Sequence, residues 1–86
     1  MKKLVETVEV QGGFDELMGE VVTFFSLNYI YTGKLVGMND THIMLEDPSI
    51  VYETGSFDTE SWKDAQKLPD SIYLMKACIE AFGLVK

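Results

Sequence analysis

The stretch from Gly33 to Asp47, GKLVGMNDTHIMLED, constrains the fold of this chain more than any other. Apolar side chains, Leu35 before and Ile43 after, flank a polar break at residues 37–40. Apolar segments on either side of a short glycine- and asparagine-containing break are typical of a hairpin. The stretch therefore predicts a strand, a tight turn and a second strand at the centre of the fold.

Two glycines, Gly33 and Gly37, lie four residues apart on one face of the first of these strands. Glycine weakens a strand by propensity, so two of them on one face indicate a sharp bend of the kind with which small barrels close. The alternative is that the sheet merely tolerates them. The following strand, from Thr41 toward Thr54, contains Pro48, which predicts an edge position or a bulge.

The chain before the hairpin gives a strand signal and a weak helix signal. Glu20–Leu27 is rich in β-branched and aromatic residues and predicts a strand covered on both faces. Phe14–Met18 combines helix-forming residues with two early acids and predicts one or two helical turns. Residues 1–13 are expected to be an N-terminal arm with a bias toward strand.

The chain after the hairpin is harder to assign. Residues 55–70 are polar and acidic, and within them the capping-box-like spacing of Ser61–Lys67 predicts a short helix that Pro69 ends. Trp62 is expected to pin this segment to the body of the domain rather than to stack on a base. Ser71–Val85 fits a strand by alternation and a helix by composition, and both remain open at this point.

Length and charge limit what the chain can do. Eighty-six residues make a single domain, residues 1–86, which buries only about 60–65 % of its unfolded surface. A hydrophobic content of 47 % is high for so thin a core and indicates self-association. Seven lysines and no arginine oppose 14 acids, and the net charge of -7 argues against strong, sequence-independent binding to a nucleic-acid duplex.

The reactive side chains are few. Cys78 is the single cysteine, which excludes an internal disulfide, and its apolar neighbours predict burial. His42 is the single histidine, and no Ser-His-Asp set, zinc motif or phosphate-cradling loop accompanies it. We expect no catalysis, no metal and no cofactor. No apolar run approaches the roughly 20 residues of a membrane span, and no signal peptide is visible, so no membrane partner and a cytoplasmic location are expected.

Two segments, Leu17–Asp47 and Leu68–Phe82, together resemble the two sequence motifs of Sm and Sm-like proteins. The first is a Gly-x-Leu-x-Gly strand followed by a turn aspartate and an apolar strand, and the second is a degraded Ile-Arg-Gly with a later isoleucine. The matching positions are Gly33, Leu35, Gly37, Asp40 (or Asn39), Ile43 and Leu45 in the first motif, and Leu74, Met75, Lys76 and Ile79 in the second.

The resemblance implies a mainly β fold: a small, strongly bent, five-stranded antiparallel barrel with a short N-terminal helix. The acidic segment 55–70 would be the variable loop between strands 3 and 4, and Ser71–Val85 would be strand. The resemblance also implies a homo-oligomeric ring of five to seven subunits, closed by pairing of edge strands. The expected oligomer interface contains Ile72, Leu74, Ile79 and Phe82.

In that family the turns at the pore face hold a uridine-rich single strand. The corresponding residues here are Asn39, Asp40, His42, Met75 and Lys76. His42 stands where the family has a base-reading asparagine, Asp40 at the stacking position, and Met75–Lys76 in place of Arg-Gly, so no uridine preference carries over. The leading hypothesis is a non-catalytic ring that binds single-stranded RNA, or else DNA, in nucleic-acid processing. The alternative is a ring-forming scaffold or assembly protein that has lost nucleic-acid binding.

Overall fold

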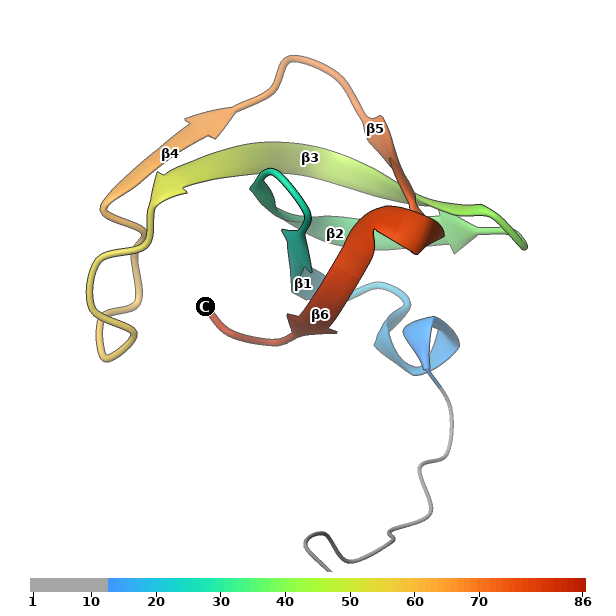
Figure 1. The fold of residues 1–86 in the computed structure, drawn as a ribbon, viewed down its shortest axis with the longest axis horizontal. Helices are drawn as coiled ribbons and strands as arrows, with labels where there is room; N and C mark the ends of the chain where they lie inside the picture. The colour runs from blue at the N-terminus through green and yellow to red at the C-terminus, as the bar shows by residue number, and fades with distance from the viewer. Residues whose placement is uncertain (1–12) are drawn as a thin grey trace, which may run out of the picture.

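The computed structural model describes residues 13–86, so the N-terminal arm predicted over residues 1–13 lies, except for Gly13, outside the described residues. Six strands and two short 3-10 helices follow one another along the described part of the chain (Figure 1). Their bounds are η1 Phe14–Leu17, β1 Val21–Ser26, β2 Ile30–Met38, β3 His42–Glu53, β4 Asp64–Lys67, β5 Ile72–Met75, η2 Lys76–Cys78 and β6 Ile79–Gly83.

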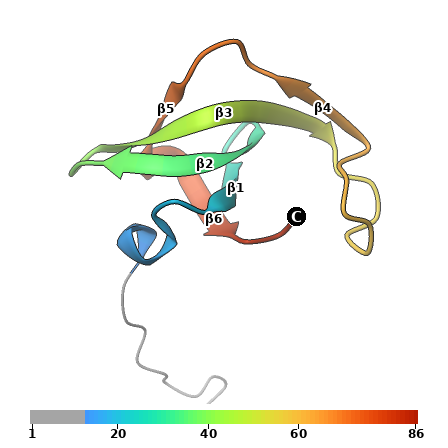
Figure 2. The ribbon, with the colours of Figure 1, turned by 180° about the vertical axis from the view of Figure 1, so that it is seen from behind.

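The strands form one antiparallel sheet in the order β4–β3–β2–β1–β6. β5 pairs with the first residues of β3 and β4 pairs with the last ones, so β4 and β5 lie in line on the same edge of β3. Figures 1 and 2 show β3 arching over β1 while the chain turns from β5 through η2 into β6, beside β1. The prediction of a mainly β, antiparallel fold is confirmed; within the described residues the sheet curls but does not close.

The sheet has six strands where five were predicted. The chain facing β3 is interrupted between β4 and β5 at residues 68–71, which include Pro69. Proline has no N–H for a ladder hydrogen bond, so regular pairing stops there. Leu68 still donates its N–H to the Pro48 carbonyl over 2.8 Å, which keeps the interrupted segment close to β3.

The helix predicted over Ser61–Lys67 is wrong, because its second half is strand β4. The backbone of β4 pairs with β3 from Ser49 to Glu53. Long-range pairing of this kind overrides the local preference of alanine, glutamine and lysine for helix. The connection between β3 and β4 therefore covers residues 54–63 rather than the predicted 55–70.

Gly33 lies at a bulge in the central hairpin. Between the pairs Thr32↔Ser49 and Lys34↔Glu46, β2 has one residue and β3 has two, Asp47 and Pro48. Asp47 has a φ of 51°, a left-handed conformation that is uncommon outside glycine. A Cβ at Gly33 would lie 3.2 Å from Leu45 Cβ and 3.2 Å from Pro48 Cα. The bulge predicted at Pro48 is present, and the glycine opposite it is required by close approach.

Gly37 has a different environment. It also follows a register shift, between Leu35 and Gly37, but a Cβ there would meet only Met44 Cβ at an ordinary 3.7 Å. The two glycines that the sequence presented as a matched pair are thus unequal, and Gly33 alone is sterically constrained.

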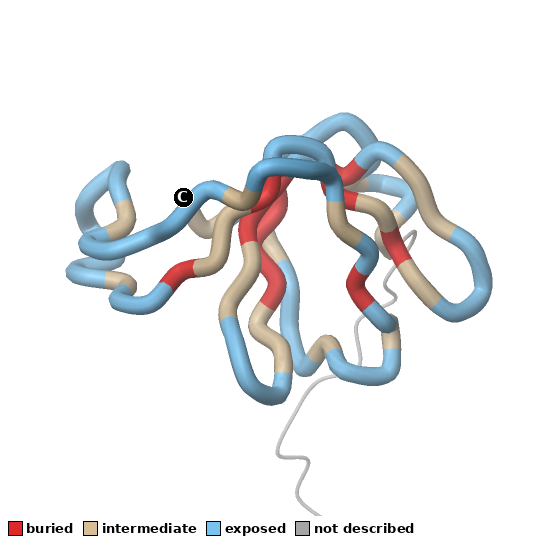
Figure 3. Tube along the Cα trace, turned by 90° about the horizontal axis from the view of Figure 1, so that it is seen from above, coloured by how far each residue is buried: buried red, intermediate tan, exposed pale blue. Residues whose placement is uncertain are grey.

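The hydrophobic core lies under β1, β2, β5 and the first half of β3. Its buried members are Val22, Phe24, Leu35, Ile43, Leu45 and Leu74. Phe14 of η1 packs below it, with its ring centroid 4.3 Å from that of Phe82 on β6. Figure 3 shows the buried segments gathered in the middle of the sheet, with exposed chain on both sides. The C-terminal segment that the sequence left open between helix and strand is mostly strand, as β5 and β6.

Candidate nucleic-acid interface

The fold brings together the two segments from which the sequence predicted binding residues. His42 opens β3 and pairs with Met75 at the end of β5. The Lys76 N–H donates to the Thr41 carbonyl over 2.9 Å, which ties η2 to the turn between β2 and β3. Residues 39–42 and 75–76, more than thirty positions apart in the sequence, thus form one continuous surface.

The β2–β3 turn is organised by the side chain of Asn39. Its Oδ1 accepts the backbone N–H groups of Thr41 at 2.9 Å and His42 at 3.0 Å. Two backbone donors fix which end of the amide faces inward, so the amide nitrogen must face His42, whose Nε2 lies 3.1 Å away. The sequence places asparagine here because its short side chain can hydrogen-bond the backbone two and three residues later.

This arrangement determines which tautomer the neutral His42 ring adopts. Because Asn39 Nδ2 is a donor, Nε2 must accept, and the proton of the neutral imidazole is then on Nδ1. Nδ1 donates to Thr41 Oγ1 over 2.9 Å, and Thr41 Oγ1 donates to Asn39 Oδ1 over 3.3 Å. Three side chains therefore form a closed circuit of hydrogen bonds. Both ring nitrogens are engaged within the turn, which leaves the aromatic surface of the ring as its free part.

Tyr73 is a residue of this surface that the sequence prediction missed. Its ring packs edge-on against His42, with centroids 5.3 Å apart and an angle of 87° between planes. It is 62 % exposed, and with Asn39, His42 and Met44 it lines a hollow of about 160 Å³. Strand alternation could have found it, because Ile72 and Leu74 face the core and their neighbour must face outward.

The remaining predicted site residues lie around this pair. Met75 follows Tyr73 on the same side of β5 and is 52 % exposed. Asp40 is exposed at the tip of the turn. The Lys76 ammonium lies 5.6 Å from the centre of the Phe14 ring, so its charge is directed toward η1 and away from the histidine. The backbone thus brings the five predicted residues to one end of the sheet, but their side chains diverge: Asn39 and His42 line this hollow, Met75 lines a second one, and Lys76 faces η1.

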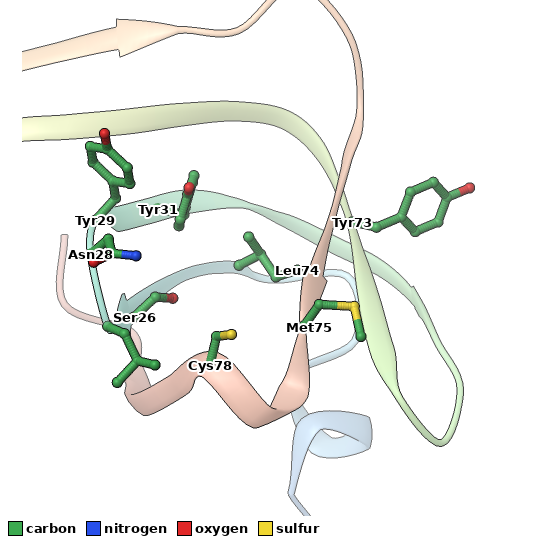
Figure 4. Close-up of a pocket in the computed structure, with 9 residues that line it drawn as sticks. Ser26, Asn28, Tyr29, Tyr31, Tyr73, Leu74, Met75 and Cys78 are labelled. Carbon is green, nitrogen blue, oxygen red and sulfur yellow. The ribbon is translucent and has the colours of Figure 1, made fainter.

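A second hollow, of about 270 Å³, lies between the β1–β2 turn and the β5–η2 segment (Figure 4). Tyr29, Tyr31 and Leu74 surround it, and Cys78 is at its η2 side. Tyr73 also belongs to its lining, but the Tyr73 ring points away from it. Cys78 is exposed, so the prediction that it is buried is wrong. The cause is η2, which turns this residue out of the strand pattern on which the prediction relied.

The predicted interface residues differ in how much surface they offer. Leu74 is only 7 % exposed because it belongs to the core, and Ile72 and Ile79 are half-buried against that core. Phe82 is 40 % exposed. Of the four side chains, Phe82 therefore offers the most exposed surface and Leu74 the least.

Among residues 13–86, no three histidine, cysteine or acidic side chains are grouped as a metal site would require. The same part of the chain contains no helix long and apolar enough to cross a membrane. The two ion pairs found there, Lys63 with Glu53 at 3.3 Å and Lys67 with Asp47 at 3.7 Å, are exposed and lie at the β4 end of the sheet. They take no part in the His42–Tyr73 surface.

Comparison with protein-family models, with curated protein sequences and with solved structures gives no match to this chain. The resemblance to Sm-like proteins therefore rests on the two short sequence motifs alone.

Proposed function

We propose that this protein is a non-catalytic module that binds single-stranded nucleic acid, RNA before DNA, as a homo-oligomeric ring. The binding face would consist of Asn39, Asp40, His42, Tyr73, Met75 and Lys76, called here the turn face. The observation that carries the proposal is the exposed aromatic pair of Tyr73 and His42 at the junction of two turns that are distant in sequence.

The chemistry of the turn face favours stacking over base reading. Each base that stacks on an aromatic side chain contributes about 1–3 kcal/mol, and every base has a face to stack. The His42 nitrogens are engaged by Asn39 and Thr41, so hydrogen-bonded discrimination between bases would be weak. Lys76 is the lysine assigned to this face, but its ammonium lies over the Phe14 ring of η1, and the net charge of -7 opposes phosphate. Binding would therefore be modest and would weaken steeply with salt.

The proposed ring rests on the two edges of the sheet. The outer edge of β6 and the outer edge of β4 and β5 have no strand partner within residues 13–86. Unpaired edges are sites of association unless they are covered or charged. Pairing of β6 of one subunit with β5 of the next is a head-to-tail contact, which closes into a ring when its rotation permits. The number of subunits, five to seven, comes from the Sm-like resemblance alone.

One observation favours the alternative, a ring-forming scaffold without a nucleic-acid ligand. The circuit of Asn39, Thr41 and His42 satisfies the polar atoms of the turn without any ligand. A turn that satisfies its own polar atoms needs no ligand to be stable. The acidic charge of the subunit, which opposes phosphate, also fits this alternative.

Fluorescence anisotropy with labelled oligo-U and oligo-A at low salt distinguishes the two functions. We expect both oligonucleotides to bind with similar affinity and the Tyr73→Ala variant to bind roughly 5- to 150-fold more weakly, which corresponds to the loss of one stacked base. Tyr52→Ala is the matched control, because Tyr52 is 54 % exposed but lies on the far half of β3. If neither oligonucleotide binds at high micromolar protein concentration, the nucleic-acid function is contradicted and the scaffold function is favoured. Light scattering at the 9.7 kDa mass of one subunit would contradict both.

A further inference from the structure

The loop between β3 and β4 surrounds one positive charge at the far end of the molecule from the turn face. Lys86 Nζ donates to the carbonyl oxygens of Thr54 at 2.8 Å, Ser56 at 2.9 Å and Ser61 at 2.9 Å. An ammonium has three N–H donors, so these three carbonyls satisfy it completely. Thr59 Oγ1 lies further out, at 3.4 Å.

Two aromatic rings complete the enclosure. The Lys86 ammonium lies 4.7 Å from the centre of the Trp62 ring and 5.5 Å from that of Phe57. The two rings are perpendicular, with 87° between their planes. Both distances are within the range in which a ring face attracts a cation. Three convergent carbonyls and two ring faces together form a cage around the Lys86 ammonium.

The loop is also suited to a cation by its charge and its shape. Residues 54–62 contain Asp58 and Glu60 and no basic residue. Ser56 holds the loop in its turned form, because its carbonyl accepts the N–H and the hydroxyl of Thr59 at 3.2 Å and 2.8 Å. Hydrogen bonds within the loop therefore help to orient the carbonyls that face Lys86, in addition to the bonds from the lysine itself.

Residues 84–85, which connect β6 to Lys86, make few contacts with the sheet. β6 ends at Gly83, which pairs with Thr23, and residues 84–86 are outside the sheet. Leu84 is 60 % exposed. In Figures 1 and 2 this segment leaves β6 and runs toward the β3–β4 loop. Beside the cage, Lys86 and Trp62 border a hollow of about 350 Å³ that reaches the buried, unpaired Thr32 hydroxyl on the sheet. Displacement of Lys86 would therefore disturb no strand, and there is space for another side chain to enter.

We propose that the loop Thr54–Trp62 is a recognition site for the lysine side chain of another polypeptide, and that Lys86 occupies it in cis as a displaceable latch. The ligand is defined by the chemistry that the cage satisfies: a primary ammonium on an alkyl chain, with three N–H donors. An acetylated lysine has no charge and only one N–H donor, so it would be rejected. Arginine would fit poorly, because its planar donors cannot converge on three carbonyls around one point.

The test uses Trp62 as its reporter, because it is the single tryptophan of the chain. The Lys86→Met variant, which keeps an unbranched side chain only one atom shorter and removes the ammonium, is titrated with Nα-acetyl-lysine methylamide. We expect a saturable change in Trp62 fluorescence with a dissociation constant on the order of millimolar. The Nε-acetylated form of the same compound should give none. Wild type should respond roughly tenfold more weakly, since its latch competes at a high effective concentration.

Lys67→Met is the matched control variant. It removes the same charge from an exposed lysine that is ion-paired with Asp47 on β3 and lines neither the cage nor the hollow beside it. It should behave as wild type does. A second measurement covers the case in which the empty loop of Lys86→Met collapses: in wild type, amide NMR should show Thr54, Ser56 and Ser61 shifting together with Lys86 as the lysine compound displaces it.

Two results would overturn the proposal. One is that the Trp62 fluorescence of Lys86→Met shows no saturable change and the loop amide signals of wild type do not shift, with the lysine compound at 100-fold the expected dissociation constant. The other is an equal response to lysine and Nε-acetyl-lysine, or an equal response of wild type and Lys86→Met, which would leave the contact as a fixed brace of the loop.

Discussion

The two halves of β3, which the bulge at Asp47–Pro48 separates, are held in different ways. In the first half Ile43 and Leu45 are both 0 % exposed and the partner strand β5 contributes the buried Leu74. In the second half Val51 is the buried apolar residue, and its partner strand β4 is exposed along its whole length. One end of the sheet is thus held by apolar packing and the other chiefly by backbone pairing and by Lys86.

Because of this difference, one end of the sheet contributes most of the folding stability and the other end can change its conformation more easily. Apolar burial is the dominant favourable contribution to folding, and it is concentrated at the turn-face end. The β4 end contributes less and can open locally without loss of the core. Of the two proposed binding surfaces, the turn face would therefore bind as a rigid platform, and the loop 54–62 would bind by exchange of one occupant for another.

The largest expected effect tests the packing of the two halves directly. Leu45→Ala should lower the free energy of unfolding by about 3 kcal/mol, since it removes a fully buried side chain and leaves a cavity. Val51→Ala removes fewer atoms and should cost about half as much. Urea unfolding of both variants measures the difference. Equal losses would mean that the β4 end is packed as well as the turn-face end, and the comparison would fail.

The next effect concerns the bulge that divides the halves. Gly33→Ala should cost about 1–3 kcal/mol, because its Cβ would press on Leu45 and on the Pro48 backbone at 3.2 Å. Gly37→Ala is the matched control on the same strand and should be neutral or slightly stabilising, since alanine meets only an ordinary contact there. Thermal unfolding midpoints decide. A Gly37→Ala variant as unstable as Gly33→Ala would show that the bend needs both glycines.

The sequence predicted the packed half well because its signals are local. β-Branched and aromatic residues in β1, and the Gly33–Asp47 pattern in the hairpin, specify strand and turn within a few residues. The strand character of the C-terminal segment was decided by the Sm-like motifs rather than by periodicity. In the turn face, Tyr73 was within reach of an alternation argument, since both its neighbours face the core.

The other half could not be predicted, because distant backbone atoms decide it. Asp64–Lys67 has a helix-favouring composition and is strand only because β3 offers an edge. The Lys86 cage is built from carbonyl oxygens 25–32 residues earlier in the chain, and every residue type has a carbonyl. No residue pattern reveals such a site, and the sequence predicts only that Trp62 pins the loop to the body of the domain.

The smallest expected effect tests how much the hydrogen bonds of Asn39 contribute to stability at the packed end. Asn39→Ala removes the acceptor of two backbone N–H groups and should cost about 1 kcal/mol, less than Gly33→Ala, because the turn is exposed and water can replace the bonds. Asp40→Ala, one residue further along the same turn, should be nearly neutral. A direct readout is ¹⁵N NMR of the His42 ring, in which wild type should show the Nδ1–H tautomer and Asn39→Ala a shift toward the Nε2–H form. If Asn39→Ala instead destabilised the protein as much as Leu45→Ala, the hydrogen-bond circuit rather than the core would hold this end, and the contrast between the two halves of β3 would have to be reversed.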